Sequence, residues 1–251
     1  MAEMSNDVRR EFAQLVDPTD GCYVPNDIVT SHTRHVDLTT VAGPAGVGKN
    51  TVMTKTGLSV VVSDTTRQPR ENDGVLEVDE REYFFRDDIA GVYEDLVYGM
   101  YVQVALVDMG EKGANIYGSR NVAYPANGPA LIDVIAGAIP KIRALRPNFN
   151  SIESAYIVAP DYETWIARLD GRGTIPPLER TKRMEEAFQS LQLGLDDHEM
   201  TFVLNEDPTI AAEALRQFAK ERYVARDMQV FAKNCGYKIL CSLSHELNRP
   251  L

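Results

Sequence analysis

The chain has 251 residues, of which 26 are Lys or Arg and 37 are Asp or Glu, so its formal net charge is −11. Hydrophobic residues make up 44% and charged residues 25%, which is typical of a globular protein that buries a core of its own. The length fits one large domain or two small ones. The acidic balance argues against a nonspecific nucleic-acid binder, although it leaves room for a local basic pocket.

The distribution of charge and cysteine points to a cytoplasmic protein. Residues 1–16 carry acidic and basic side chains and no apolar core, so we expect no secretory signal. No apolar run approaches the roughly 20 residues of a membrane span, so we expect no membrane partner. The cysteines Cys22, Cys235 and Cys241 form no CxxC pair and show no zinc-type spacing. Such a sparse, odd count is typical of reduced thiols, and we expect Cys235 and Cys241 to be packing residues.

Apolar periodicity predicts alternating strands and helices along most of the chain. The predicted strands are residues 37–42, 58–62, 130–135, 155–159 and 201–204. The predicted helices are residues 5–16, 49–57, 138–145 (with Pro140 in the first turn), 161–169, 178–192 and 208–222. For residues 64–82 we expect an exposed loop or a small subdomain. For the run 237–241 we expect a short strand. This alternation predicts an α/β fold with a mostly parallel sheet.

The segment Gly43-Pro-Ala-Gly-Val-Gly-Lys-Asn-Thr51 fits the phosphate-loop pattern G-x-x-x-x-G-K. It lies between a predicted strand and a predicted helix, a position that argues against a chance glycine-rich turn. Gly43, Gly46 and Gly48 allow backbone N–H groups around Val47 to converge on a phosphate, and the helix N-terminus adds its positive dipole end. Lys49 would reach the β- and γ-phosphates.

The residue after the lysine departs from the pattern. A Ser or Thr hydroxyl usually contacts Mg²⁺ there, whereas this chain has Asn50 followed by Thr51. An amide oxygen can face a hydrated Mg²⁺ directly or through water, or Thr51 can take the role. The sequence leaves both assignments open.

A second anion site is suggested by Ser63-Asp-Thr-Thr-Arg-Gln-Pro-Arg70 and the following Glu82-Tyr-Phe-Phe85. Arg67 and Arg70, braced by Pro69, can clamp a phosphate, and the hydroxyls of Ser63 and Tyr83 can donate to it. Taken alone, the stretch could equally be a solvated charged loop.

The order of motifs resembles the guanylate kinase family over residues of about 38 to 220. The phosphate loop and the Ser-x-Thr-Thr-Arg-x-Pro-Arg segment carry this resemblance together with five later elements: Asp108 followed by Ala114–Ser119, Leu131–Asp133, Ala159-Pro160, Arg168–Thr174 with Arg183, and Val203–Asp207. The resemblance implies a P-loop NTPase-type mostly parallel sheet flanked by helices, with an inserted acceptor-binding subdomain and a lid. It divides the chain into an N-terminal extension (1–36), a guanylate kinase-like domain (37–220; acceptor segment about 64–120, lid about 170–184) and a C-terminal extension (221–251).

The resemblance also implies a function, ATP-dependent phosphoryl transfer to GMP or dGMP with Mg²⁺, and a role for each matching residue. Lys49, Arg172 and Arg183 would be catalytic, and ATP would bind to Gly43, Gly46, Val47, Gly48, Lys49, Asn50 and Thr51. Ser63, Arg67, Arg70, Tyr83 and Tyr117 would hold the acceptor phosphate, Asp108 and Ser119 would contact the guanine edge, and Asp133 would belong to the same acceptor site. Mg²⁺ would be held at Asn50 or Thr51. No histidine is needed as a base, because the acceptor phosphate is already an anion.

Several departures from the family pattern keep alternatives open. Asp108 is one methylene shorter than the usual Glu, Ile135 stands where a second acidic residue is usual, and Pro176 and Pro177 lie where the lid usually has acidic residues. A nucleoside monophosphate kinase with another base preference is therefore a second hypothesis. An inactive guanylate kinase-like module that binds a phosphopeptide is a third. The sequence predicts no oligomeric state.

Overall fold

The computed structural model describes residues 23–69, 71–72, 75–80, 83–108, 114–171 and 177–250. These residues form two compact units, one made of 37–60 with 128–250 and the other of 23–36 with 61–127. The predicted helix over 5–16 lies outside the described residues.

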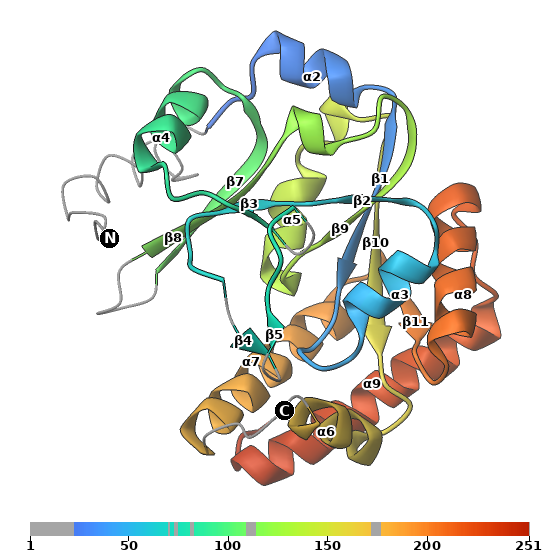
Figure 1. Cartoon of the computed structure of the whole chain (residues 1–251). Helices are drawn as coiled ribbons and strands as arrows, with labels where there is room; N and C mark the ends of the chain where they lie inside the picture. The colour runs from blue at the N-terminus through green and yellow to red at the C-terminus, as the bar shows by residue number, and fades with distance from the viewer. Residues whose placement is uncertain are drawn as a thin grey trace. The chain divides into compact units, whose positions relative to one another are not determined.

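The larger unit is built on a five-stranded sheet in the order β11-β10-β1-β9-β2 (Figure 1). Its strands are β1 (Val36–Ala42), β2 (Ser59–Val61), β9 (Gly128–Asp133), β10 (Ser151–Val158) and β11 (Met200–Leu204). Strand β10 pairs in parallel with β1 on one side and with β11 on the other. Strand β1 is buried along almost its whole length, as expected for a strand covered on both faces.

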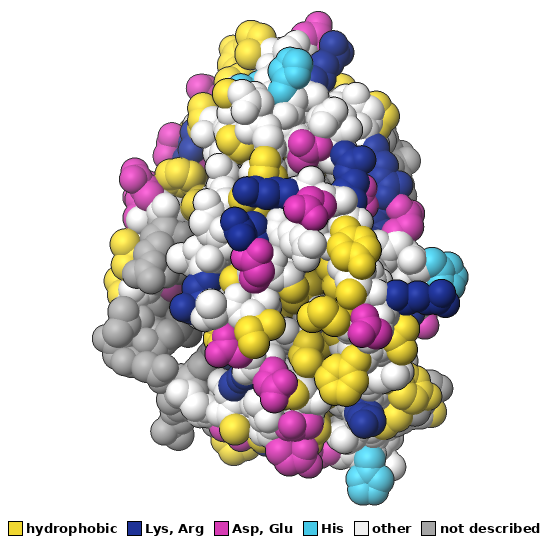
Figure 2. Space-filling view, turned by 90° about the vertical axis from the view of Figure 1, so that its right-hand side faces the viewer, with side chains coloured by type: hydrophobic (Ala, Val, Ile, Leu, Met, Phe, Trp, Pro, Cys, Tyr) yellow, Lys and Arg dark blue, Asp and Glu magenta, His cyan; other side chains and the backbone are white. Residues whose placement is uncertain are grey.

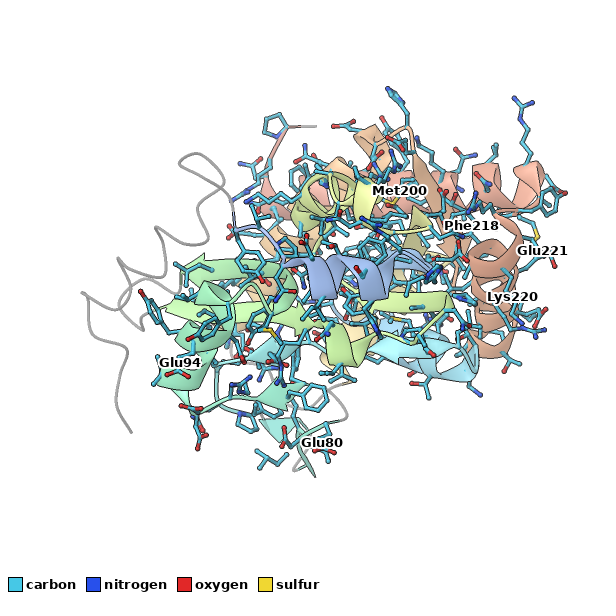
Figure 3. The ribbon with its side chains drawn as sticks, turned by 90° about the horizontal axis from the view of Figure 1, so that it is seen from above. Glu80, Glu94, Met200, Phe218, Lys220 and Glu221 are labelled. Atoms are coloured by element: carbon cyan, nitrogen blue, oxygen red, sulfur yellow. The ribbon has the colours of Figure 1, made fainter. Side chains whose placement is uncertain are left out.

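Helices flank this sheet and bury their apolar faces on it. They are α3 (Lys49–Lys55), α5 (Ile139–Arg143), α6 (Tyr162–Asp170), α7 (Pro177–Asp196), α8 (Pro208–Glu221) and α9 (Arg226–Leu247), with the 3₁₀ turns η3 (Ala136–Ala138) and η4 (Arg146–Asn148). Helix α3 lies beside α8, and α9 contacts α7, β10 and β11. At the end of α8, Phe218 is buried whereas Lys220 and Glu221 are exposed, so the helix is amphipathic (Figure 3).

The predicted elements of this unit are confirmed except at the C-terminal end. Pro140 lies in the first turn of α5, as the sequence indicates. The suggested strand over 237–241 is wrong, because these residues belong to the 22-residue helix α9. Cys235, Ile239 and Leu243 of that helix are buried in the main core and recur every four residues, which is a helical spacing. The segment that the sequence sets apart as an extension therefore contributes to the core.

The smaller unit holds a four-stranded sheet in the order β6-β3-β8-β7. Its elements are α2 (Asp27–Thr33), β3 (Asp64–Thr65), β6 (Phe84–Phe85), α4 (Ile89–Val97), β7 (Tyr101–Asp108), β8 (Ala114–Arg120) and η2 (Asn121–Ala123), with a separate pair β4 (Glu71–Asn72) and β5 (Val75–Leu76). Strands β7 and β8 form an antiparallel pair, and Val92, Leu96, Tyr101 and Ile116 make a small core. The subdomain expected around 64–82 is thus part of a larger folded unit.

Buried charges hold this small unit together. The carboxylate of Asp64 lies 3.0 Å from Arg86 NH1 and 2.8 Å from Arg120 Nε, and it accepts a 2.9 Å hydrogen bond from the Tyr101 hydroxyl. The Asp64 side chain is 3% exposed, so these partners replace its lost hydration. Arg86 also contacts Asp95 at 3.1 Å, which ties α4 to the same network.

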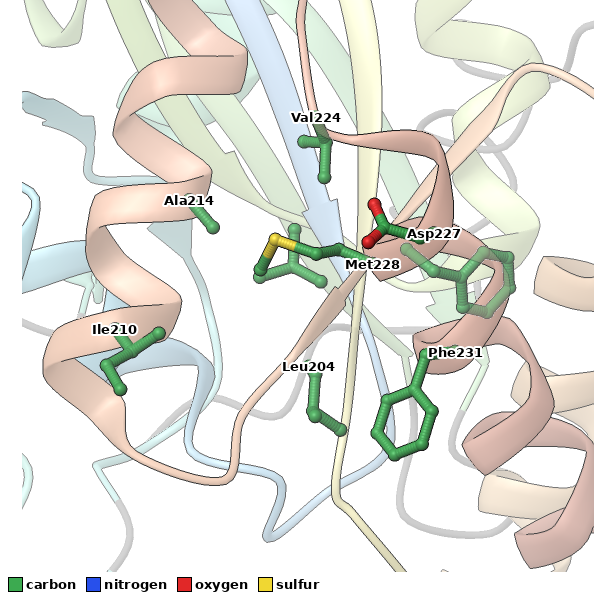
Figure 4. A pocket seen from close by; sticks show the side chains of 9 residues that line it. Leu204, Ile210, Ala214, Val224, Asp227, Met228 and Phe231 are labelled. Carbon is green, nitrogen blue, oxygen red and sulfur yellow. The ribbon is translucent and has the colours of Figure 1, made fainter.

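The surface of the larger unit carries an apolar groove. Figure 2 shows hydrophobic side chains grouped among scattered acidic and basic ones on this face. A cavity of about 380 Å³ lies between β11, α8 and α9 and is lined by Ile210, Met228 and Phe231 among others (Figure 4). None of its lining residues is a predicted site residue, so we place the candidate site elsewhere. Among the described residues, no helix has both the length and the apolar character needed to cross a bilayer.

Candidate active site

The phosphate loop joins the carboxyl end of β1 to the N-terminus of α3. Gly46 and Gly48 have φ values of 84° and 92°, which side-chain-bearing residues rarely adopt. A Cβ atom on Gly48 would lie 2.7 Å from Asn205 Nδ2, so the position also has no room for a side chain. The sequence therefore gives this turn a shape in which backbone N–H groups and a helix N-terminus converge, which is suited to a phosphate.

Two side chains from outside the loop fix that shape. Asn205, directly after β11, donates from Nδ2 to the Val47 carbonyl at 2.7 Å, and its own backbone N–H bonds to the Val158 carbonyl at 2.8 Å. Trp165 of α6 donates from Nε1 to the Ala45 carbonyl at 2.9 Å. Neither role is predicted from the sequence. The only available signal is the position of Asn205 in the Val203–Asp207 segment.

Lys49 lies over the loop and faces one carboxylate. Its Nζ donates to the Gly43 carbonyl at 2.9 Å and lies 3.8 Å from Oδ1 of Asp133, at the end of β9. The Lys49 side chain is 16% exposed and that of Asp133 is 39% exposed. A phosphate in the loop would compete with both oxygens for this ammonium group.

Oxygen donors suited to Mg²⁺ lie at the same end of the sheet. Asn50 and Thr51 are exposed in the first turn of α3, and Asp133 is the last residue of β9, the neighbour of β1. Amide, hydroxyl and carboxylate oxygens are the ligands that Mg²⁺ takes in proteins, usually together with phosphate oxygens and water. Within the described ranges, no cluster of three or more His, Cys, Asp or Glu could hold a metal by itself. The residues thus fit a metal that arrives with a nucleotide.

Three of the predicted acceptor residues, Arg67, Tyr83 and Tyr117, meet in the smaller unit around β3 and β6. Asp133, which the family resemblance also gives to the acceptor site, belongs to the larger unit and lies near Lys49. The Arg67 guanidinium is centred 4.7 Å from the Tyr83 ring and 5.3 Å from the Phe85 ring. Tyr83 and Tyr117 contact edge to face, with centroids 5.8 Å apart. Ser63 directly precedes β3, and its carbonyl accepts a hydrogen bond from the Phe84 N–H. The structure therefore brings a cation and two phenol groups together, a combination that can hold a phosphate.

Arg67 has a carboxylate partner that the sequence does not indicate. Its NH1 contacts Oε2 of Glu77 at 2.5 Å and its NH2 contacts Oε1 at 2.9 Å. Burial alone would lower the pKa of Arg67, but the hydrogen bond and the charge of Glu77 raise it above its ordinary value. The guanidinium is accordingly a fixed cation in this cluster.

The residues predicted to contact a base are only partly described. Asp108 ends β7 opposite Ala114, but its side chain lies outside the described atoms. Ser119 is fully buried, and its hydroxyl lies 2.8 Å from the Tyr124 hydroxyl and 3.2 Å from Gln103 Nε2. A hydroxyl has one donor hydrogen and two acceptor lone pairs, so these two bonds leave Ser119 with the capacity for one further contact to a base.

The predicted lid is described only at its two ends. Arg183 of α7 bonds to Glu179 one turn earlier at 2.6 Å and is 24% exposed. Arg168 of α6 donates to the carbonyls of Asn205 (2.7 Å) and Glu206 (3.2 Å), so it braces the segment that holds the phosphate loop. Arg70 and Arg172 lie outside the described residues.

Comparison with known proteins assigns the family. The chain is 32% identical over 161 residues to a guanylate kinase of Thermobifida fusca, covering 60% of this chain and 74% of the relative. It is 30% identical over 189 residues to a guanylate kinase of Corynebacterium diphtheriae, covering 72% of this chain and 92% of the relative. The chain belongs to the guanylate kinase family. No protein-family model matches it.

A solved guanylate kinase has the same fold. The structure of guanylate kinase from Anaplasma phagocytophilum superposes with a TM-score of 0.52 and 18% identity, over 80% of this chain and 94% of that protein. The predicted guanylate kinase family and the predicted P-loop-type α/β fold are thus confirmed. The roles of individual residues stay predictions.

Proposed function

We propose that this guanylate kinase family member is a nucleoside monophosphate kinase that transfers the γ-phosphoryl group of ATP to GMP or dGMP, giving ADP and GDP or dGDP. The proposal rests on one observation: this member of the family has both of the anion sites that phosphoryl transfer needs. One is the phosphate loop with Lys49, and the other is Arg67 with Tyr83 and Tyr117. An inactive binding module would need only the second site.

On the donor side, backbone N–H groups of 43–48 and the start of α3 hold the ATP phosphates. Lys49 leaves the Gly43 carbonyl and follows the γ-phosphate, where charge develops during transfer. Arg172 and Arg183 close on the transferring group from the lid. Asn50, Thr51 and Asp133 would hold Mg²⁺ together with phosphate oxygens; when bound, the metal neutralises charge on those oxygens.

On the acceptor side, Arg67, Arg70, Ser63, Tyr83 and Tyr117 bind the monophosphate. They orient a phosphate oxygen toward the γ-phosphorus, and no general base is required because that oxygen is already anionic. The protein therefore acts mainly by positioning two anions and by offsetting their charge.

Base selection is assigned to Asp108 and Ser119. A carboxylate can accept from N1–H and N2–H of guanine together, whereas adenine has no N1–H to donate. A base that leaves the carboxylate without a hydrogen-bond partner binds more weakly, because the carboxylate loses its hydration without gaining a hydrogen bond. The predicted cytoplasmic location and the predicted Mg²⁺ stay predictions that rest on the sequence and the family.

The test is an ADP-release assay with ATP and Mg²⁺ in which GMP, dGMP, AMP, CMP and UMP are offered separately. Turnover with GMP or dGMP alone is expected. Turnover with a different base would favour the kinase of other specificity. A folded protein that turns over none of the five, yet binds a phosphorylated peptide, would favour the binding module.

A further inference from the structure

We propose that Glu77 is a positioning residue that fixes the Arg67 guanidinium so that one edge of it stays available to the acceptor phosphate. This inference rests on the proposed function and adds to it a residue with no part in the acceptor motif. The observation is the two-point contact of Glu77 with NH1 and NH2 of Arg67, at 2.5 and 2.9 Å.

The donors of Arg67 show which edge remains. A guanidinium has five N–H donors in a fixed plane. Glu77 receives one from NH1 and one from NH2, and the Gln68 carbonyl receives another from NH1 at 2.9 Å. Within the described part of the chain, no acceptor is found for Nε–H or for the second NH2 hydrogen. These two donors point the same way, and such a parallel pair fits two phosphate oxygens.

The plane of the guanidinium is also fixed. Tyr83 and Phe85 present their rings to it at centroid distances of 4.7 and 5.3 Å. The Arg67 side chain is only 7% exposed, so water does little to solvate it or to reorient it. Glu77 thus fixes the orientation of the guanidinium group within its own plane, and the two rings fix the tilt of that plane.

Glu77 directly follows β5 and lies two residues before a hydrogen-bonded turn that begins at Asp79. Asp79 accepts a 2.8 Å hydrogen bond from the Phe85 N–H, and the Glu80 N–H donates to the Tyr83 carbonyl at 2.9 Å. Glu80 has a φ of 65°, which lets the chain reverse there. The Glu77 side chain is 13% exposed, so the carboxylate is largely buried against Arg67 and is not a free surface group.

Glu77 could instead compete with the phosphate for Arg67, because both are anions. The two roles predict opposite results. A competing carboxylate would occupy the edge that the phosphate needs, and its removal would strengthen GMP binding. A positioning carboxylate occupies the other edge, and its removal would weaken GMP binding because the guanidinium is no longer held in register.

The experiment measures the Kd of GMP and the steady-state constants for wild type, E77Q, E77D and the matched control E94Q. Glutamine keeps the size of Glu77 but has one acceptor oxygen and places an NH₂ group against an Arg67 donor. Glu94 is an exposed glutamate on α4 of the same unit (Figure 3). For E77Q we expect the Kd and KM for GMP to rise at least about tenfold, the KM for ATP to stay within about twofold, and kcat to fall much less.

E77D keeps the charge and is expected to lie between wild type and E77Q, whereas E94Q is expected to match wild type. A double-mutant cycle with R67K tests the route of the effect: if Glu77 acts through Arg67, E77Q adds little to R67K. Should E77Q fail to fold, E77D and the cycle E77D/R67K carry the same test. An unchanged or lower Kd for GMP in folded E77Q or E77D, or additive effects in the cycle, would overturn the inference. A wild-type protein that neither binds nor phosphorylates GMP would overturn the proposed function instead.

Discussion

The side-chain amide of Asn205 donates a 2.7 Å hydrogen bond to the carbonyl of Val47, which joins the end of β11 to the middle of the phosphate loop. The same amide nitrogen lies only 2.7 Å from where a Cβ atom on Gly48 would be. The loop is therefore shaped from outside as well as by its own glycines, and the energetic role of this bond can be measured.

We expect N205A to weaken ATP binding. The substitution leaves the buried Val47 carbonyl without its donor, a loss of about 1–3 kcal/mol that corresponds to a rise of about 5- to 150-fold in the KM for ATP. The KM for GMP should change little. The matched control is N150A, which removes an exposed hydrogen bond to Asp37. Equal effects of both substitutions on the KM for ATP would contradict the bracing role.

Arg183 is expected to act in the transfer step. Its ion pair with Glu179 joins a partly exposed arginine to an exposed glutamate one helical turn away and is worth little, so it can be exchanged for a phosphoryl contact. R183M should lower kcat by at least about 100-fold while the protein stays folded. K182M removes an adjacent exposed cation from the same helix and should leave kcat within about twofold of wild type. A normal kcat in R183M would remove Arg183 from the mechanism.

The buried network around Asp64 should dominate the stability of the smaller unit. D64N removes the buried negative charge that Arg86 and Arg120 share, although Arg86 keeps its contact with Asp95, and we expect a loss of about 3 kcal/mol in the free energy of unfolding, measured in urea. D95N removes a more exposed partner of Arg86 and should cost about 1 kcal/mol or less. Similar losses of unfolding free energy for the two variants would show that the burial of Asp64 does not increase its contribution to stability.

The stability of the chain should fall in acid in part through Asp161. This N-cap of α6 accepts from the Thr164 N–H, and that bond lowers the pKa of Asp161 below its ordinary value. A carboxylate with a lowered folded pKa stabilises the fold at pH values above its unfolded pKa, about 3.9, and loses that contribution as the pH falls through the folded pKa. D161N still caps the helix but cannot titrate.

The melting temperature of D161N should therefore depend less on pH than that of wild type below about pH 4. Above pH 6 the two proteins should differ by a constant amount. If the melting temperatures of both proteins fall in parallel as the pH is lowered, groups other than Asp161 account for the acid sensitivity.

Local patterns predict much of the larger unit, because its strands are short apolar runs bounded by turns and its helices have clear apolar faces. The phosphate loop is predicted for the same reason, since Gly43, Gly46, Gly48 and Lys49 lie within one contiguous segment. The strand suggested at 237–241 is wrong because a five-residue apolar run fits a strand and a buried helix turn equally well. Only the longer spacing of Cys235, Ile239 and Leu243 distinguishes the two.

The contacts that shape the two anion sites could not be predicted in the same way. Asn205 reaches the phosphate loop across 158 residues of sequence, and Trp165 reaches it across 120. Glu77 is ten residues from Arg67, but the two pair only because the intervening chain turns back. Such contacts depend on tertiary structure, which neither periodicity nor a contiguous motif encodes.

The most direct test of the proposed phosphoryl transfer is to incubate ATP, GMP and MgCl₂ with the wild-type protein or with K49M. The ADP and GDP formed are then quantified by chromatography or ³¹P NMR. We expect wild type to form ADP and GDP in equal amounts, and K49M to form both at least about 100 times more slowly. Formation of ADP without GDP would show ATP hydrolysis in place of transfer. That outcome, or an unimpaired K49M, would contradict the proposal that the phosphate loop delivers a phosphoryl group to the acceptor.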